Sequence, residues 1–258
     1  MTALPHRLDR TVVIRAPRDL VFRFFTDTPR WASWWGSGSS IDARPGGRML
    51  IRLPGGTEAS GEVVEVSPPE RIVFTYGYAS GTPAIPPGGS RVTIHLDTHQ
   101  DGTRVRLTHE LPDAAVRDEH VQGWRYQLSL FANVVTNEVH AHAAALVDRW
   151  FAIWNDTDAA SRQSALASIA RPDVQFKDRF SVIDGLDELL PQLAAMHHFM
   201  PGLRLERRHD VRHCQGHVLA DWAVLKGDQQ AGSGTNLFVL DADGRIASVV
   251  GFWGSAGL

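Results

Sequence analysis

Asp178 is the residue whose surroundings in the sequence most favour acid–base chemistry. We predict a strand over 174–180. Because successive side chains of a strand alternate between its two faces, Asp178 shares a face with the apolar Phe176 and Phe180. A carboxylate among apolar neighbours is either hydrogen-bonded or has a raised pKa, and a pKa raised toward neutrality is what a general acid or base needs. Two interpretations follow: Asp178 transfers protons, or it only accepts a hydrogen bond from a tryptophan or backbone N–H.

The stretch RWASWWGSG at 30–38 places three tryptophans on one face of a predicted helix, since Trp31, Trp34 and Trp35 stand at i, i+3 and i+4. Such a face either seals a core or lines a groove for an apolar or aromatic ligand. We expect Trp34 or Trp35 to do only the former. His109 lies on a predicted apolar strand face, which is more typical of a hydrogen-bonded core histidine than of a base. The candidate ligand-binding residues around this groove are Trp31, Trp35, Tyr76, His109 and Trp124.

Three histidines could in principle bind a metal ion. His209, His213 and His217 have a spacing that would place three ligands on one face of a helix. However, Gln215-Gly216 is typical of a turn between strands, which separates His217 from the other two. The sequence has no CxxC pair, no Gly-rich phosphate loop and no GxSxG elbow. We therefore predict no metal and no cofactor.

Composition narrows the class of partner. The 258-residue chain has a formal net charge of −3 and is 43% hydrophobic and 21% charged, which is typical of a globular protein with no general attraction to nucleic acid or anionic membrane. No apolar run approaches the ~20 residues of a membrane-spanning helix, and the first residues lack the apolar stretch of a secretory signal. The single cysteine, Cys214, cannot form an internal disulfide. We expect a cytoplasmic protein that binds neither nucleic acid nor membrane.

The elements that must position the aromatic residues begin with a β-branched run at 11–14, a predicted strand, followed by two short helices. The second helix starts at Thr28-Pro29, an N-cap and first-turn pair, and ends at Gly36. Alternating strands follow, with a hairpin turn at Asp101-Gly102. Apolar residues at 121, 124, 128, 131 and 135 then predict a long amphipathic helix. A curved antiparallel sheet that packs on this helix leaves a groove between them.

This order of motifs resembles a known superfamily. The segments APRDLVFRFFTDTPRWASWWG, GEVVEVSPPERIVFTYGY, TRVRLTHEL and EHVQGWRYQLSLF are similar to the SRPBCC superfamily of helix-grip, START-like domains, in the branch of the activator of Hsp90 ATPase, over residues 10–136. The resemblance implies the helix-grip fold and says much less about activity. It also raises the alternative of an Hsp90 co-chaperone-like interaction protein.

The second half begins without an obvious linker, because a helical pattern restarts near 139 and runs to 154. We place the boundary so that the domains are 1–137 and 138–258. A second helix, the strand containing Asp178, a turn and a third helix follow, and strands with hairpin turns at Gln215-Gly216 and Asp243-Gly244 come last. Helices followed by a sheet predict an α+β domain, so both halves belong to the α+β class.

This half resembles the NTF2-like superfamily, in the SnoaL-like branch that includes polyketide cyclases and is akin to ketosteroid isomerase. The matching segments are WFAIWN, RPDVQFKDRFSVIDGLDEL, VLADWAVLKG and GTNLFVLDADGRIASVVGFW, within residues 143–254. The resemblance implies a cone of helices on a bent sheet with an internal pocket and a homodimer formed through the sheet. It also implies that an inward aspartate, here Asp178, moves a proton next to a carbonyl. The candidate pocket residues are Trp154, His198, Trp222 and Asn236.

Two pocket-forming domains favour the handling of a small hydrophobic molecule. We predict first a ligand-binding protein without a cofactor, for aromatic, polyketide-like or steroid-like compounds. The second hypothesis is a cofactor-independent cyclase or isomerase that uses Asp178 as general acid or base. The third is the Hsp90 co-chaperone-like interaction protein.

Overall fold

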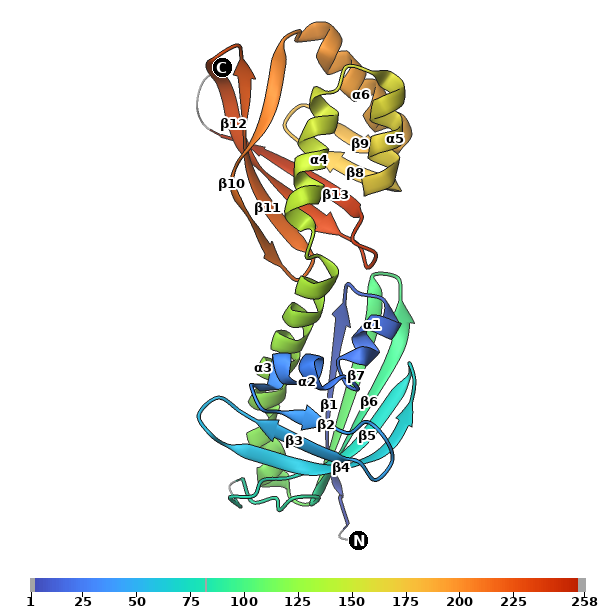
Figure 1. Ribbon diagram of the computed structural model, residues 1–258, viewed down its shortest axis with the longest axis vertical. Coiled ribbons are helices and arrows are strands. Elements are labelled where there is room, and N and C mark those ends of the chain that lie inside the picture. Colours follow the sequence, from blue (N-terminus) through green and yellow to red (C-terminus); the bar gives the residue numbers. More distant parts are fainter. Residues whose placement is uncertain (1–2, 82, 255–258) are drawn as a thin grey trace. The chain divides into compact units, whose positions relative to one another are not determined.

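The computed structural model describes residues 3–81 and 83–254 of the chain. Contacts between residues divide the chain into two compact units, one on each side of the step from Thr136 to Asn137. We name them the first unit and the second unit and describe each by itself (Figure 1).

The first unit is built on one antiparallel sheet. Its strands are β1 (His6–Ile14), β2 (Ser40–Ile41), β3 (Arg48–Arg52), β4 (Glu58–Ser67), β5 (Arg71–Tyr76), β6 (Ser90–His99) and β7 (Gly102–Leu111). They pair in the order β1-β7-β6-β5-β4-β3-β2, so β2 to β7 follow one another across the sheet and β1 pairs with β7. The β6–β7 hairpin turns at residues 100 and 101, because His99 already pairs with Gly102. The predicted turn was one residue too late.

The helices of this part of the chain are α1 (Arg18–Arg23), α2 (Thr28–Trp35) and α3 (Ala114–Val139). Helix α2 begins one residue earlier than predicted, because Asp27 and not Thr28 is its N-cap: the Asp27 carboxylate accepts a hydrogen bond from the Arg30 N–H at 3.1 Å. The Thr28 hydroxyl instead donates to the carbonyl oxygen of Ile41 at 3.0 Å, which ties the helix to β2. Gly36 ends the helix at φ 136°, a backbone conformation that favours glycine.

The long helix α3 packs its apolar stripe against α1, α2 and the sheet. The Phe131 ring lies 6.0 Å from Phe24 and 4.8 Å from Phe25, and Trp124 reaches His109 on β7. The buried residues of this stripe are Val116, His120, Trp124, Gln127, Leu128, Phe131, Ala132, Val135 and Thr136. Buried positions recur every three or four residues, as the helical repeat requires, so the sheet and α3 form the predicted helix-grip arrangement.

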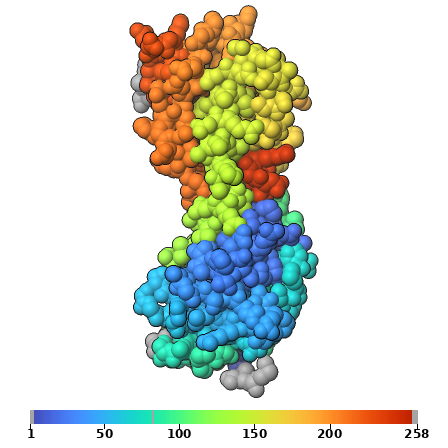
Figure 2. All heavy atoms as spheres, in the orientation of Figure 1, coloured from blue at the N-terminus to red at the C-terminus, as the bar shows by residue number. Residues whose placement is uncertain are grey.

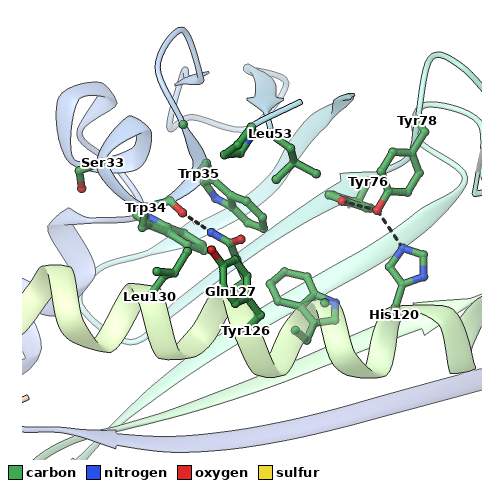
Figure 3. A pocket seen from close by; sticks show the side chains of 14 residues that line it. Ser33, Trp34, Trp35, Leu53, Tyr76, Tyr78, His120, Tyr126, Gln127 and Leu130 are labelled. Atoms are coloured by element: carbon green, nitrogen blue, oxygen red, sulfur yellow. Dashed lines mark hydrogen bonds between the residues drawn. The ribbon is translucent and has the colours of Figure 1, made fainter. Parts of the chain in front are cut away.

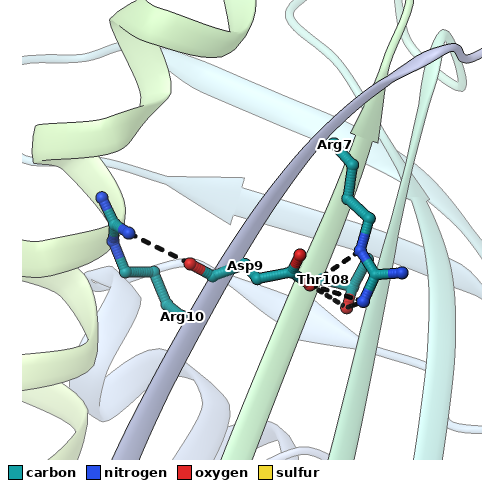
Figure 4. Close-up of polar contacts among 4 residues, drawn as sticks. All are labelled: Arg7, Asp9, Arg10 and Thr108. Carbon is teal, nitrogen blue, oxygen red and sulfur yellow. Dashed lines mark hydrogen bonds and ion pairs between the residues drawn. The ribbon is translucent and has the colours of Figure 1, made fainter.

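Edge strand β1 carries charged side chains. Asp9 stands opposite Thr108 of β7, and its carboxylate accepts hydrogen bonds from Arg7 at 2.8 Å and from the Thr108 hydroxyl at 2.7 Å (Figure 4). Arg10 donates to the Asp9 carbonyl oxygen at 3.0 Å. Charged groups on an edge strand disfavour the addition of a strand from another chain.

The second unit places three helices on a mixed sheet. The helices are α4 (Ala143–Asn155), α5 (Ala159–Ile169) and α6 (Leu186–Phe199). The strands are β8 (Ala170–Lys177), β9 (Val182–Asp184), β10 (Leu203–Cys214), β11 (His217–Lys226), β12 (Gln229–Leu240) and β13 (Ile246–Trp253), in the order β10-β11-β12-β13-β8-β9. Strands β13 and β8 pair in parallel, whereas the other pairs of neighbouring strands in this described sheet are antiparallel.

The core of the second unit lies between α4 and the sheet. The ring of Trp150 on α4 lies 5.8 Å from Phe238 of β12 and 6.2 Å from Phe176 of β8, and all three are buried. The opposite face of α4 reaches the surface beside α5 and the orange strands (Figure 2). Both units are therefore α+β, as predicted. Within the described residues, no helix is both long enough and apolar enough to cross a membrane.

Candidate functional site

A cavity of about 490 Å³ lies in the first unit beside α2 and α3 (Figure 3). Its wall combines α2, the loop after β3, β5 with the residues that follow it, and one face of α3. The lining residues are Ser33, Trp34, Trp35, Gly36, Leu53, Pro54, Tyr76, Tyr78, His120, Gly123, Trp124, Tyr126, Gln127 and Leu130. A smaller cavity of about 330 Å³ shares Gly36, Leu53 and Pro54 with it and includes the ion pair of Arg52 and Glu58.

Stacked indole rings form the apolar part of the lining. The Trp34 and Trp35 rings lie 4.3 Å apart, and Trp35 lies 5.7 Å from Trp124 in an edge-on contact. Gln127 of α3 donates its side-chain N–H to the backbone carbonyl oxygen of Trp34, which fixes α2 against α3. Helix and sheet therefore hold these rings in place without any ligand.

A hydrogen-bonded chain forms the polar part of the lining. The Tyr76 hydroxyl lies 2.8 Å from the Tyr78 hydroxyl, which lies 3.2 Å from Nε2 of His120 (Figure 3). Nδ1 of His120 lies 2.7 Å from the carbonyl oxygen of Val116, one turn earlier in α3. Burial lowers the pKa of His120 below its ordinary value of 6.5, while it raises the pKa of both tyrosines. At neutral pH all three groups are uncharged.

One buried polar atom of the lining has no partner among the described residues. The indole N–H of Trp35 is enclosed and meets no acceptor, although the side chain is only 4% exposed. An enclosed donor without an acceptor costs about 1–3 kcal/mol. The nitrogen has no surface open to water, so a ligand acceptor pairs with it only when the Trp35 ring shifts.

The structure brings together three of the five residues predicted for this groove. Trp35, Tyr76 and Trp124 line the cavity, but two corrections are needed. Trp31 is fully buried, because its indole N–H donates to the Leu50 carbonyl oxygen at 3.1 Å and its ring packs on Phe74. Trp31, and neither Trp34 nor Trp35, is thus the tryptophan that serves only the core.

His109 is also a core residue. It lies behind the cavity wall with no exposed surface, between the Ser90 hydroxyl at 2.8 Å and the Trp124 indole N–H at 3.0 Å. Burial, and after it the nearby His120, lowers the pKa of His109 to about 3. Both ring nitrogens already have partners, so His109 supports Tyr76 and Trp124 from behind.

Sequence reasoning did not assign the other eleven lining residues to the groove, among them Trp34, Tyr78, His120 and Gln127. A signal for two of them was available: His120 and Gln127 lie four residues before and three residues after Trp124, hence on the same face of α3. Tyr78 lies two residues after Tyr76, the last residue of β5. Its backbone lies beyond β5 and forms an isolated bridge with Ala59.

Asp178 of the second unit is not enclosed by apolar neighbours. Strand β8 ends at Lys177, so the predicted strand over 174–180 is too long, and Phe180 is 61% exposed. Asp178 itself is half-buried, and its carboxylate accepts hydrogen bonds from the Phe180 backbone N–H at 2.8 Å and the Trp253 indole N–H at 3.3 Å. These are the two kinds of donor that we expect where Asp178 only accepts a hydrogen bond from a tryptophan or backbone N–H.

Two further predicted residues of this unit lie close to Asp178. The Trp222 indole N–H donates to the side-chain oxygen of Asn236 at 2.8 Å, and both residues are buried. A Cβ added to Gly251 would lie 3.2 Å from that Asn236 oxygen and 3.2 Å from Cβ of Asp178, so Gly251 lies directly between them. Trp253, which sequence reasoning missed, completes the group through its ring contact with Trp222 at 4.8 Å.

The other predicted residues of this unit lie elsewhere. Trp154 is buried against Phe176 in the core, with ring centres 5.5 Å apart. His198 is exposed at the end of α6 and packs on Phe199, which corrects its assignment as a pocket residue. The neighbouring His197 has the buried ring nitrogen, an Nε2 without a hydrogen-bond partner in the described part of the chain.

The histidines considered as metal ligands lie on strands. His209 adopts a positive φ of 57° in the irregular part of β10, and His217 begins β11 after the predicted turn. His213 contacts Asn137 at 2.9 Å and His140 at 3.1 Å. Among residues 3–81 and 83–254, no three His, Cys, Asp or Glu side chains are grouped so that they could hold a metal ion.

Comparison with known families agrees with both predicted resemblances. Residues 15–136 match the family described as activator of Hsp90 ATPase homolog 1-like protein, and residues 147–249 match the SnoaL-like domain. The chain therefore joins an SRPBCC-type domain of the Hsp90 ATPase activator-like family to an NTF2-type, SnoaL-like domain. No curated protein matches the chain.

Solved structures of similar fold each align with about half of the chain. A SnoaL-like family protein from Agrobacterium tumefaciens str. C58 is 20% identical, with a TM-score of 0.42 over 46% of this chain and 99% of its own. The Aha1 dimer from Colwellia psychrerythraea is 18% identical, with a TM-score of 0.41 over 48% of this chain and 90% of its own. CalU16 from Micromonospora echinospora is 26% identical, with a TM-score of 0.40 over 51% of this chain and 76% of its own.

Proposed function

We propose that the first unit binds a small, largely apolar aromatic molecule in the cavity beside α2 and α3. The observation that carries this proposal is the lining itself. Trp34, Trp35 and Trp124 present aromatic surface to a cavity of about 490 Å³, which is within the usual range for small-molecule sites. Tyr76 and Tyr78 add a few fixed polar groups at one place, as sites that orient a ligand do.

The unsatisfied indole N–H of Trp35 supports the same proposal. A core residue with this geometry would destabilise the fold without benefit, whereas a cavity residue whose ring shifts when a ligand binds regains the lost hydrogen bond. The binding reaction needs no group beyond the chain's own side chains, so we propose binding without a cofactor.

The first test is native mass spectrometry of the purified full chain, followed by extraction and identification of any small molecule that it carries. An aromatic or other apolar compound that co-purifies supports the proposal and names its chemical class. A calorimetric titration of the empty chain with 2-naphthol is the companion measurement. A chain that carries no small molecule and shows no heat of binding with this probe contradicts the proposal and favours the protein-interaction hypothesis.

Gly123 offers a variant that fills the cavity. It lies on α3 in the lining, and a Cβ added there meets no atom within 4 Å. We expect Gly123→Phe to fold, because the backbone is helical and the space is open, and to lose 2-naphthol binding. The matched control is Ala115→Phe, at an exposed position of the same helix outside the lining. Equal affinities in the two variants would place the ligand elsewhere.

A second candidate function is proton transfer in the second unit. The observation that favours it is the grouping of Asp178, to which the resemblance assigns the proton transfer, with the predicted pocket residues Trp222 and Asn236. Each oxygen of the Asp178 carboxylate accepts one hydrogen bond and keeps a further lone pair.

The test of this second function is deuterium exchange at the acidic carbon next to the carbonyl of 2-tetralone, followed by NMR. We expect the chain to accelerate exchange and Asp178→Asn to abolish the acceleration. The matched control is Asp173→Asn, which removes an exposed carboxylate, paired with Arg171, from strand β8 just before Asp178. Equal exchange rates with the Asp178 variant and the unaltered chain would exclude Asp178 as the base.

We also propose that the whole protein is a homodimer and that it acts in the cytoplasm. A homodimer through the second unit would give twice the monomer mass in sedimentation, and a monomer would contradict it. The free, exposed Cys214 is consistent with the reducing cytoplasm, where we propose that the chain acts.

A further inference from the structure

We infer that the cavity of the first unit selects ligands that present a hydroxyl or N–H donor, with a hydroxylated aromatic ring as the simplest class. The inference rests on the proposed ligand binding. It adds that the polar group of the ligand is a hydrogen-bond donor. It is carried by the direction of the three hydrogen bonds from Tyr76 to Val116.

The direction of these hydrogen bonds is fixed by the last of them, which lies within α3. A backbone carbonyl can only accept, so Nδ1 of His120 must carry the proton that it donates to Val116 at 2.7 Å. The neutral ring then has a lone pair on Nε2. The Tyr78 hydroxyl must donate to that lone pair, at 3.2 Å, and so it has no proton left for Tyr76.

The same argument applies one step further along. Because Tyr78 has used its proton, the Tyr76 hydroxyl donates to the Tyr78 oxygen, at 2.8 Å. Every proton in this series of hydrogen bonds therefore points away from Tyr76 and toward α3. The Tyr76 oxygen accepts no hydrogen bond from the described residues, and Tyr76 is one of the residues that line the cavity.

The consequence is a chemical preference. A phenol or an amine N–H can donate to the Tyr76 oxygen, whereas an ether or ketone oxygen at the same place would meet lone pairs only. The Trp35 N–H is the complementary group, since it is the only buried unpaired polar atom that a described lining residue contributes. The matching ligand is thus an aromatic compound with a hydroxyl near Tyr76 and an acceptor such as a carbonyl near Trp35.

The test compares 2-naphthol with its methyl ether, 2-methoxynaphthalene, by calorimetric titration of the full chain at neutral pH. The two probes have the same ring system and differ in the donor. The quantity compared is the ratio of their dissociation constants in the unaltered chain and in Tyr76→Phe, because that comparison cancels their different hydrophobicity. We expect the preference for the phenol to fall about tenfold in the variant, as for the loss of one good hydrogen bond.

Tyr126→Phe is the matched control. Tyr126 is the third tyrosine of the chain, is 66% exposed, and its hydroxyl takes no part in the chain from Tyr76 to His120. Tyr126 also lines the cavity, so a ratio that falls in Tyr126→Phe and not in Tyr76→Phe assigns the contact with the phenol to Tyr126 and overturns the inference. Should Tyr76→Phe fail to fold, Tyr78→Phe tests the same point, because it frees the Tyr76 proton for the ether and reduces the preference.

The outcomes separate the two claims. Binding of both probes with the same ratio in the unaltered chain and in Tyr76→Phe overturns the inference and leaves the proposed function intact. Binding of neither probe by the unaltered chain overturns the proposed function and the inference with it. A ratio that falls in Tyr76→Phe but not in Tyr126→Phe supports both.

Discussion

The indole N–H of Trp124 donates to Nδ1 of His109 across 3.0 Å and so joins helix α3 to strand β7 behind the cavity. Because Nδ1 accepts, the proton of the neutral His109 ring is on Nε2, which donates to the Ser90 hydroxyl oxygen at 2.8 Å. Ser90 in turn donates to the backbone carbonyl oxygen of Tyr76 at 2.8 Å. Each donor in this buried network has an acceptor, so the network fixes the positions of two lining residues.

The first prediction concerns the stability that this network provides. His109→Leu leaves the buried Trp124 N–H without an acceptor and the Ser90 hydroxyl oxygen without its donor, and we expect the free energy of unfolding to fall by about 2 kcal/mol or more. Urea denaturation followed by tryptophan fluorescence measures it. The control is His95→Leu, at an exposed position of β6. A loss no larger than that of the control would show that the network contributes nothing to stability.

The second prediction is a pH dependence of stability. The pKa of His109 is about 3 in the folded chain, against 6.5 as the ordinary value, so the unfolded chain binds more protons between these values. Stability from this residue is complete above pH 6.5 and is lost as the pH falls, by up to about 1.4 kcal/mol per pH unit. The lowered pKa of His120 acts in the same direction.

Urea denaturation at several pH values between about 7 and 5 checks this slope, in a range where most carboxylates stay ionised. His109→Leu is expected to have a shallower slope than the unaltered chain, because a group whose pKa falls to about 3 on folding is gone. Parallel slopes would mean that His109 is protonated in the folded chain too.

The third prediction is that acid weakens the preference for a hydroxyl donor. Protonated His120 donates from Nε2 to Tyr78, Tyr78 then donates to Tyr76, and the Tyr76 proton turns toward the cavity. Since burial lowers the pKa of His120, the change occurs below pH 6.5. The groups that bear on this titration are Glu119, which favours the charged ring, and His109, whose ring lies 5.1 Å away.

The measurement is the ratio of the 2-naphthol and 2-methoxynaphthalene dissociation constants at neutral pH and at about one to two pH units lower. We expect the ratio to move toward the ether as the pH falls. A ratio that does not change while His120 titrates, as followed by its NMR shift, contradicts the assigned direction of the hydrogen bonds.

Periodicity was sufficient to predict the α+β class and the packing of a sheet on the long helix, whereas the named folds followed from the family resemblances. The apolar repeat of α3 and the alternation in β5 and β7 report burial directly, because a helix or strand must direct its apolar face to the core. Element ends were less predictable. Strand β8 ends at Lys177 because Asp178 accepts a hydrogen bond from the Phe180 N–H, a local turn that competes with the strand and that alternation does not reveal.

The candidate site was only partly predictable for a related reason. Helical spacing places Trp31, Trp34 and Trp35 on one face, but it does not say which ring meets the core and which meets the cavity. That choice depends on partners far along the chain, such as the Leu50 carbonyl oxygen for Trp31 and Gln127 for the Trp34 carbonyl oxygen. The hydrogen bonds that connect Tyr76 to His120 likewise join residues that are 44 positions apart in the sequence.

The last prediction tests the packing around Asp178 with two glycines of neighbouring strands. A Cβ at Gly234 would lie 2.2 Å from the Phe252 carbonyl oxygen and 2.4 Å from the Trp222 ring, and a backbone oxygen cannot move aside. A Cβ at Gly251 would lie 3.2 Å from the Asn236 side chain, which can shift by a few tenths of an ångström. We therefore expect Gly234→Ala to lower the free energy of unfolding by about 3 kcal/mol, as overpacking does, and Gly251→Ala by clearly less.

Urea denaturation of the full chain measures both variants, and the transition of the second unit is identified as the one that Gly234→Ala displaces. The pair is informative because both substitutions add the same methyl group to the same sheet. If Gly251→Ala is the more damaging of the two, then Asn236 and Asp178 are held more rigidly than the Trp222 ring. Asp178 would then be fixed in one position by its neighbours, as the proton-transfer function requires.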